Sequence, residues 1–389
     1  MKRILYVEAN EDGTVGGSHK IQYDLVTRLS SDFEPLVLHY QDNIWSSRFR
    51  EQGIEVLTWD DFRGLENGRL SGADRIRRWS LHAGAVRKRF QLLKKLRVDL
   101  VHLNNSPFVG YQDWLPAAKF AGIPCVTYAM GDASREPRAS RRFALREFSA
   151  YFPLSRYIEE SLHSNGISPS RIVLTYPGVD LEALDRLNLR PRNEIRAEFG
   201  LGAEQLLVVM VGNIRHWKGQ HVVIDALGSL PSDTLANLKI LFVGEGATGE
   251  HAEYRKCLDQ ATEQAGLNDA IVFTGRREDV PDLLEAADIA IHASIIPEPF
   301  GLVVQEAMFH GCAVIAAAAG GPVEMLDEHS GLMFDTADPA QLTHHLTCLA
   351  RDDEFRKRLS ENARIKARQF GVRRHVELIE ARYRHLLSR

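Results

Sequence analysis

Two glutamates, Glu298 and Glu306, are spaced so that they flank the predicted start of a helix. The apolar run at 288–292 precedes them and predicts a buried parallel strand. Prolines on both sides of Glu298 exclude a helix there, whereas the apolar spacing after Gly301 predicts a helix that ends near Gly311. We therefore expect one carboxylate in a strand-to-helix loop and the other in the second turn of the helix.

The predicted helix has free backbone N–H groups near its first residues, Phe300, Gly301 and Leu302. A helix N-terminus beyond a parallel strand favours an anion such as phosphate, whereas carboxylates accept hydrogen bonds from hydroxyl groups. A phosphate between two hydroxyl-rich groups describes a nucleotide sugar, with Glu306 on the ribose and Glu298 on the sugar. The alternative is an ordinary strand, loop and helix with two surface carboxylates.

A pair of cations, Arg215 and Lys218, follows the apolar strand predicted at 206–211. Ligands of parallel α/β sheets bind beyond the carboxyl ends of the strands, so we expect both cations at the same edge as Glu298. Two fixed cations can neutralise a leaving diphosphate without a metal ion. A surface charge pair is the alternative.

Two glycine-rich turns also follow predicted strands. Gly16 and Gly17 lie between the first strand and the first helix, where backbone amides can approach a phosphate. A Gly-x-Gly-x-x-Gly sequence at 244–249 matches a dinucleotide fingerprint, but it does not follow the first strand of its domain, and no acidic residue ends the next strand. We interpret it as a tight turn that places Gly244 near the sugar or phosphate.

The elements that must position these residues alternate between strand and helix, which predicts parallel sheets with helices on both faces. The strands expected are 4–7, 35–39, 54–58, 98–103, 123–128, 149–154, 171–174, 206–211, 238–243, 271–274, 288–292, 313–316 and 331–334. The length of 389 residues fits two domains of ordinary size.

The Glu-Pro-Phe-Gly-Leu motif at 298–302, with its second glutamate eight positions after the first, resembles the signature of the family 4 retaining glycosyltransferases. The cation pair, the Gly-Gly loop and the segment 176–180 resemble the same family. The resemblance implies the α/β GT-B fold, two Rossmann-like doubly wound domains facing a central cleft. It divides the chain into an acceptor-binding domain at 1–180, a donor-binding domain at 181–370 and a helix at 371–389 that returns to the N-terminal domain.

The resemblance further implies an enzyme of class EC 2.4 that transfers a sugar from a nucleoside diphosphate to an acceptor hydroxyl with retained configuration. The leaving phosphate would take the proton of the acceptor, and no cofactor or metal is expected. The implied catalytic residues are Glu298, Arg215 and Lys218. The implied donor-binding residues are Gly16, Gly17, Gly244, Arg276, Phe300, Gly301, Leu302 and Glu306, with Arg276 beside the nucleobase.

One departure from the family concerns the end of the strand predicted at 123–128. Many members have a histidine and a small residue there, where this chain has Ala129 and Met130. Three nearby polar residues are candidates for acceptor contacts, with capping or turn roles as the alternative. They are Asn104, Asn105 and Asp132.

A basic segment at 69–97 contains ten Lys and Arg residues against one acidic residue, interleaved with large apolar side chains. A second basic segment spans 135–146. These segments could contact an anionic membrane, bind an anionic acceptor, or form solvated helix faces. Family members that glycosylate lipid-linked acceptors often have such a patch on the N-terminal domain, and this resemblance favours cell-surface polysaccharide or glycolipid synthesis.

Composition excludes several other classes. The net charge of −4 argues against a general nucleic-acid binder, and no Cys-x-x-Cys pair occurs among the four cysteines. Free thiols and the absence of a signal-peptide core predict a cytoplasmic protein, at the inner face of the membrane if the basic segments bind lipid. Two alternatives remain, a nucleotide-sugar epimerase on the same fold and a non-catalytic nucleotide-sugar binder.

Overall fold

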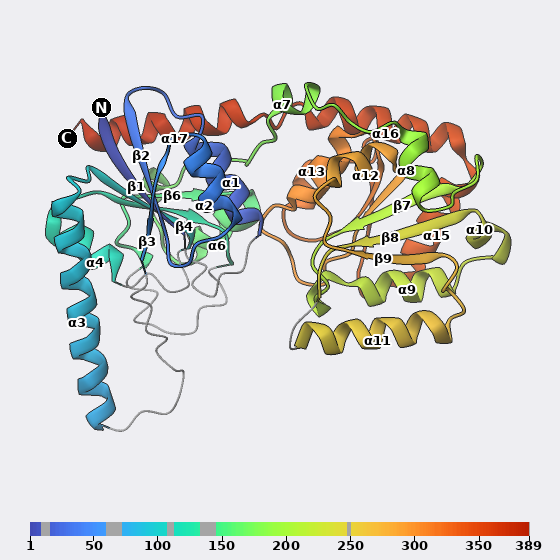
Figure 1. Cartoon of the computed structure of the whole chain (residues 1–389), viewed down its shortest axis with the longest axis horizontal. Helices are drawn as coiled ribbons and strands as arrows, with labels where there is room; N and C mark the ends of the chain where they lie inside the picture. Colours follow the sequence, from blue (N-terminus) through green and yellow to red (C-terminus); the bar gives the residue numbers. More distant parts are fainter. Residues whose placement is uncertain (9–15, 60–71, 107–112, 133–144, 247–249, 389) are drawn as a thin grey trace. The chain divides into compact units, whose positions relative to one another are not determined.

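The computed structural model describes residues 1–8, 16–59, 72–106, 113–132, 145–246 and 250–388. The chain divides into two compact units. The first unit comprises Met1–Gly178 together with Val372–Arg389, and the second comprises Val179–Gly371. Each unit is built on a six-stranded parallel sheet with helices on both faces, which confirms the expected fold class (Figure 1).

The first sheet has the strand order β3-β2-β1-β4-β5-β6. Its strands are β1 (Lys2–Glu8), β2 (Phe33–His39), β3 (Glu55–Thr58), β4 (Leu100–Ser106), β5 (Cys125–Ala129) and β6 (Ala150–Pro153). The helices of this unit include α1 (Gly17–Val26), α2 (Ile44–Glu51), α3 (Gly72–Lys95), α4 (Trp114–Ala121), α6 (Arg156–Ser164) and α17 (Val372–Leu387).

The prediction of a strand at 171–174 is wrong. This segment contributes only an isolated parallel bridge between Tyr151 and Ile172. The neighbouring strand β6 is four residues long and ends in Pro153, which has no N–H to continue a ladder.

Successive residues of the central strand β1 face opposite helix layers. Leu5 and Val7 belong to the core that contains Leu93 of α3 and Trp114 of α4. On the other face, the hydroxyl of Tyr6 accepts a hydrogen bond from Tyr383 of α17 at 3.3 Å. Burial on both faces explains why these strands are continuous apolar runs in the sequence.

Buried polar contacts fix α17 to the first unit. Nδ1 of His102 in β4 is hydrogen-bonded to the hydroxyl of Tyr383, and the hydroxyl of Tyr128 in β5 lies 2.7 Å from Nε2 of His375. Burial lowers the pKa of His102 to about 3 and that of His375 to about 4, with the charge of His375 adding to the shift of His102. Both imidazoles are therefore neutral at pH 7.

The second sheet has the strand order β12-β11-β10-β7-β8-β9, which reverses direction between β10 and β7. Its strands are β7 (Leu206–Val211), β8 (Leu238–Val243), β9 (Ile271–Gly275), β10 (Ile289–His292), β11 (Ala313–Ala317) and β12 (Leu332–Phe334). Such a reversal is where doubly wound sheets bind ligands.

The second unit places α9 and α11 on one face of its sheet and α8, α12 and α13 on the other (Figure 1). Its helices include α7 (Leu181–Asp185), α8 (Arg192–Glu198), α9 (Gln220–Gly228), α10 (Ser232–Ala236), α11 (Glu250–Gln264), α12 (Val280–Ala286), α13 (Leu302–Phe309), α14 (Pro322–Met325), α15 (Pro339–Arg351) and α16 (Asp353–Ala367). Short 3₁₀ turns occur at η2 (Pro169–Arg171) and η3 (His216–Lys218).

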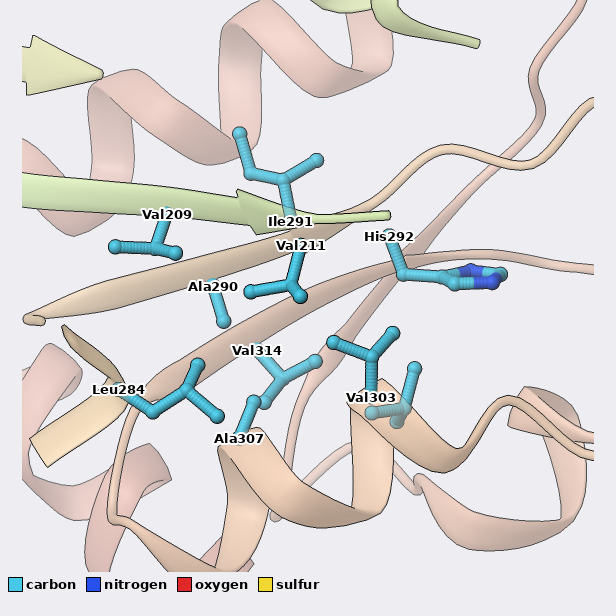
Figure 2. Close-up of a pocket in the computed structure, with 10 residues that line it drawn as sticks. Val209, Val211, Leu284, Ala290, Ile291, His292, Val303, Ala307 and Val314 are labelled. Atoms are coloured by element: carbon cyan, nitrogen blue, oxygen red, sulfur yellow. The ribbon is translucent and has the colours of Figure 1, made fainter. Parts of the chain in front are cut away.

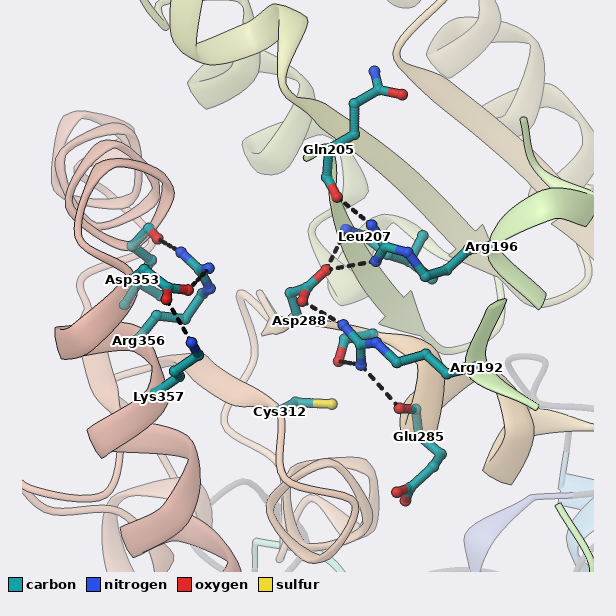
Figure 3. A network of polar contacts seen from close by, with 12 residues as sticks. Arg192, Arg196, Gln205, Leu207, Glu285, Asp288, Cys312, Asp353, Arg356 and Lys357 are labelled. Carbon is teal, nitrogen blue, oxygen red and sulfur yellow. Dashed lines mark hydrogen bonds and ion pairs between the residues drawn. The ribbon is translucent and has the colours of Figure 1, made fainter. Parts of the chain in front are cut away.

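An ion-pair network holds α8 to the amino ends of β7 and β10. Figure 3 shows Arg192 and Arg196 converging on Asp288, which also accepts the backbone N–H of Leu207 at 2.8 Å. Cys312 lies nearby with its pKa raised by burial to about 12, and all four cysteines are free. This network is at the sheet edge opposite to the glutamate motif, so its role is structural.

Candidate functional site

Glu298 lies in the loop between β10 and α13, beyond the carboxyl end of the strand. Three hydrogen-bond donors converge on one of its oxygens, Oε1. Nζ of Lys218 lies 2.6 Å away, Nε2 of His292 lies 2.9 Å away, and the hydroxyl of Ser294 donates as well. Lys218 follows β7 and His292 ends β10, so the cluster forms where the strand order reverses.

The environment of Glu298 favours its charged form. Burial, the largest single influence, raises the pKa of this carboxyl group. The positive charges of His292 and Lys218 lower the pKa, and so do the hydrogen bonds from both side chains. Together these effects outweigh the effect of burial. The net pKa is far below the ordinary value, so Glu298 is an ionised carboxylate and not a proton donor at neutral pH.

Glycines shape the loop around this carboxylate. The backbone N–H of Gly321 donates to the carbonyl of Glu298 at 2.9 Å, and Gly320 pairs with Glu298 in an isolated parallel bridge. Gly320 has a φ of +71°, and a Cβ at this position would lie 2.3 Å from the Glu298 carbonyl oxygen. Only glycine allows this close approach of the two backbones.

The turn that carries Arg215 and Lys218 depends on another glycine. Gly219 has a φ of +78°, and a Cβ there would lie 1.9 Å from the carbonyl oxygen of Ala293. The turn therefore packs directly on the segment that leaves β10. The ammonium group of Lys218 lies 4.4 Å from the centroid of the Trp217 ring, within the range of a cation–π contact.

Arg215 differs from the other cations of the site. Its guanidinium group makes no ion pair or hydrogen bond with the residues that the structure describes, and its Nε atom is buried without a partner. A buried N–H group without an acceptor is unfavourable unless a ligand supplies one. The guanidinium group is thus available to an anion.

The N-terminus of α13 is also available to an anion. Gly301 occupies the N-cap position with a φ of +87°, no side chain caps the helix, and its first turn contains no acidic residue. Phe300 is buried beneath the turn, and Glu306 is half-buried in the second turn of the helix, as expected from the spacing. The first backbone N–H groups of the helix, before Val304, can therefore bind a phosphate.

Gly244 has a structural reason to be glycine, because a Cβ would lie 2.1 Å from the carbonyl oxygen of Gly212. Its own N–H donates to the carbonyl of Gly275 at 3.0 Å, which joins the ends of β8 and β9. The rest of this motif, at 247–249, lies outside the described residues.

Arg276 is exposed and makes no ion pair with described residues. The adjacent Arg277 is committed to ion pairs with Asp279 and Glu198, both at 2.6 Å. Of these two arginines, Arg276 is the one available to a ligand.

The predicted binding residues of the first unit differ in exposure and in their contacts. Gly16 and Gly17 are exposed at the N-terminus of α1, but the preceding loop at 9–15 lies outside the described residues. Asn104 is buried, and its amide donates to the carboxylate of Glu8 and, at 3.1 Å, to the carbonyl of Ser18. These contacts join β1, β4 and α1, which is a structural role.

Asp132 accepts a hydrogen bond from the hydroxyl of Tyr157 at 3.1 Å. The side chain of Asn105 and most of the basic segment at 135–146 lie outside the described residues. Ala129 is buried at the end of β5, and Met130 follows it half-buried.

Two residues of the cluster, His292 and Ser294, had no predicted role. The sequence feature that could have indicated His292 is a polar imidazole at the end of an otherwise apolar strand. No cluster of three possible metal-ligating side chains occurs in the described part of the chain. Among the same residues, no helix is both long enough and apolar enough to cross a bilayer.

The chain matches two protein families that together span most of its length. Residues 15–183 match Glycosyltransferase Family 4, and residues 191–366 match Glycosyl transferases group 1. The D-inositol 3-phosphate glycosyltransferase of Corynebacterium efficiens is 34% identical over 218 residues, which are 55% of this chain and 51% of that protein. The chain thus spans about half the length of the first curated relatives it matches.

Other similar proteins are matched over more of the chain. The spore coat protein SA of Bacillus subtilis is 27% identical over 300 residues, which are 73% of this chain and 78% of that protein. The crystal structure of HepE from Anabaena in complex with UDP-glucose is 25% identical, with a TM-score of 0.79, and the match covers 98% of this chain and 99% of that one. The two family matches and the two parallel sheets establish that this chain belongs to the family 4, group 1 glycosyltransferases and has the GT-B fold.

Proposed function

We propose that the protein is a retaining glycosyltransferase that uses a UDP-sugar. The observation that carries the proposal is the guanidinium group of Arg215, whose buried Nε atom has no partner among the described residues and which lies in the same short turn as Lys218. A site with two cations, an uncapped helix N-terminus and an ionised carboxylate suits a diphosphate bonded to a sugar. HepE, which binds UDP and UDP-glucose, supports uridine as the nucleoside.

The second unit would bind the nucleotide sugar, and the first would bind the acceptor. Arg215, Lys218 and the amides at the start of α13 stabilise the diphosphate as the bond between the sugar C1 and the phosphate oxygen breaks. Glu306 accepts hydrogen bonds from the ribose, and Glu298 accepts them from the sugar. Lys218 carries three N–H donors, so it can contact both Glu298 and phosphate.

The acceptor hydroxyl attacks C1 from the face that the diphosphate leaves, which retains the configuration. Its proton passes to the leaving phosphate oxygen, so no protein base is required. Glu298 is ionised and stabilises positive charge that develops on the sugar ring. Gly244 and Arg276 complete the part of the proposed donor site that the second unit contains.

Calorimetric titration with UDP, GDP, ADP and TDP tests the binding site. We expect UDP to bind and the Glu306→Ala variant to bind it more weakly by about 1.5–3 kcal/mol, which is about 10- to 100-fold. The absence of binding by all four nucleotides would contradict the proposal. Incubating the preferred UDP-sugar without an acceptor tests the epimerase alternative, because an epimerase would convert the sugar. The anomeric configuration of the product formed with an acceptor tests whether transfer retains the configuration.

We further propose that the surface formed by α3 and α4 contacts an anionic membrane that carries a lipid-linked acceptor. Exposed cations occur on the described part of α3 at Arg87, Lys88, Lys94 and Lys95. Phe120, near the end of α4, is 74% exposed, and Nζ of Lys94 donates to the carbonyl of Ala121 beside it at 3.1 Å. A protruding aromatic ring among cations can insert between anionic lipids.

Cosedimentation with vesicles tests this contact. Binding to vesicles containing phosphatidylglycerol, but not to phosphatidylcholine alone, is expected, and Phe120→Ser combined with Lys94→Glu should weaken it. An equal distribution of wild type and variant between vesicles and supernatant would exclude this surface. A membrane contact of this kind would place the reaction in cell-surface polysaccharide or glycolipid synthesis.

A further inference from the structure

His292 contributes to the proposed site without an evident contribution to the fold. It ends β10 after three apolar residues, Ile289, Ala290 and Ile291, and is 5% exposed. Its Nδ1 atom is buried and has no hydrogen-bond partner in the part of the chain that the structure describes. An apolar residue at this position would avoid that cost, so the fold alone does not explain a histidine here.

Among the described residues, the imidazole has one polar contact, and that contact is with Glu298. Figure 2 shows its ring turned away from the aliphatic side chains that line a small apolar pocket beside β10, among them Val209 and Val314. Nε2 lies 2.9 Å from Oε1 of Glu298. Because the ionised carboxylate can only accept, the proton of this hydrogen bond is on Nε2.

The two carboxylate oxygens of Glu298 differ in their hydrogen bonds, because all three donors contact the same oxygen. Lys218 follows β7, whereas His292 and Ser294 lie at the end of β10 and just after it, and all three donate to Oε1. Oε2 makes no hydrogen bond with the described residues and remains available to a sugar hydroxyl. The carboxylate is therefore oriented before the sugar arrives.

In the proposed reaction the three donors do not have equal roles. Negative charge grows on the leaving diphosphate, which competes with Glu298 for the ammonium group of Lys218. His292 and Ser294 have no such second task. We infer that His292, assisted by Ser294, is the positioning residue that keeps Glu298 oriented toward the sugar while Lys218 serves the diphosphate.

This inference rests on the proposed function, and its test separates sugar binding from nucleotide binding. The His292→Phe variant removes the donor and keeps a ring, whereas His292→Gln restores a donor near the position of Nε2. We expect His292→Phe to bind UDP within about twofold of wild type. It should bind UDP-glucose, or whichever of UDP-galactose and UDP-N-acetylglucosamine wild type prefers, about 10- to 100-fold more weakly. His292→Gln should recover most of the loss.

A matched control exists in the same unit. His310 is also buried and bonded to a glutamate, with its Nδ1 atom 2.9 Å from Glu285, but it lies at the opposite end of α13. This end is about 13 Å from Gly301 at 1.5 Å per helical residue. His310→Phe should lower the melting temperature and leave the difference in affinity between UDP and UDP-sugar unchanged.

Equal weakening of UDP and UDP-sugar in His292→Phe, or wild-type affinity for both, would overturn the inference. If His292→Phe does not fold, Ser294→Ala decides, because the inference requires it to weaken UDP-sugar selectively. Failure of wild type to bind UDP would instead contradict the proposed function.

Discussion

The ammonium group of Lys218 lies 2.6 Å from the carboxylate of Glu298, and both side chains are largely buried. A close buried pair of this kind is held by the charge of each partner, so the loss of one leaves the other uncompensated. The two residues are 80 positions apart in the chain and meet because β7 and β10 are neighbours in the sheet.

The Lys218→Ala variant should affect both chemistry and stability. It removes a contact with the leaving diphosphate, so we expect the transfer rate to fall about 100-fold or more. It also leaves a buried carboxylate with fewer donors, so the free energy of unfolding should fall by about 3 kcal/mol. Single-turnover kinetics and urea unfolding measure the two effects. Lys256→Ala removes a pair on the exposed surface and should change neither. A fully active Lys218→Ala enzyme would refute the assignment.

The Arg215→Met variant should lose no stability, in contrast to Lys218→Ala. Arg215 has no partner among the described residues, so its replacement by an apolar side chain should leave the melting temperature unchanged or raise it. Affinity for UDP should fall by about 10- to 100-fold, because charge-assisted hydrogen bonds to phosphate are lost. Thermal shift measured with and without UDP reports both quantities. A large drop in stability without nucleotide would indicate a structural arginine.

A methyl group at Gly320 should disturb the loop that holds Glu298. Gly320→Ala meets two obstacles, a positive φ and a Cβ that would lie 2.3 Å from the Glu298 carbonyl oxygen. Gly266 has a similar φ of +68° but open space around the same position. Gly266→Ala should therefore cost only the backbone strain, about 1–2 kcal/mol. Gly320→Ala should cost more and also reduce kcat, so equal effects of both substitutions would show that the steric contact is unimportant.

Acid should weaken the attachment of α17 to the first unit. The pKa values of His102 and His375 are lowered in the folded state to about 3 and about 4, so the unfolded chain binds more protons between these values and pH 6.5. Stability is thus fully present above pH 6.5 and falls with pH, by about 1.4 kcal/mol per pH unit for each histidine. Urea unfolding between pH 7.5 and 4.5 should show a shallower decline for His102→Phe. The exposed His329→Asn should retain the wild-type dependence.

Much of the fold could be predicted from the sequence because buried parallel strands are continuous apolar runs. The run at 206–211 coincides with β7, and the helix after Gly301 begins where the glycine predicted it. The error at 171–174 arose because strand formation also depends on the neighbour, and a proline ends β6. Spacing within one segment placed Glu298 and Glu306 correctly relative to α13.

Contacts between distant segments were beyond local patterns. Nothing in the sequence near Asn104 indicates that its amide is buried against Glu8, which is 96 residues away. A local contact can also escape a periodic pattern: the convergence of His292 and Ser294 on one carboxylate oxygen depends on the path of the irregular loop between them and Glu298.

The attachment of α17 to the first unit has a consequence for biosynthesis. The first unit consists of two separate stretches of chain, with the contiguous second unit at Val179–Gly371 inserted between them. The ribosome must therefore translate all of the second unit before the first can be completed. During that interval, the face of β4 and β5 that carries His102 and Tyr128 lacks its covering helix, which makes the nascent first unit a target for chaperones.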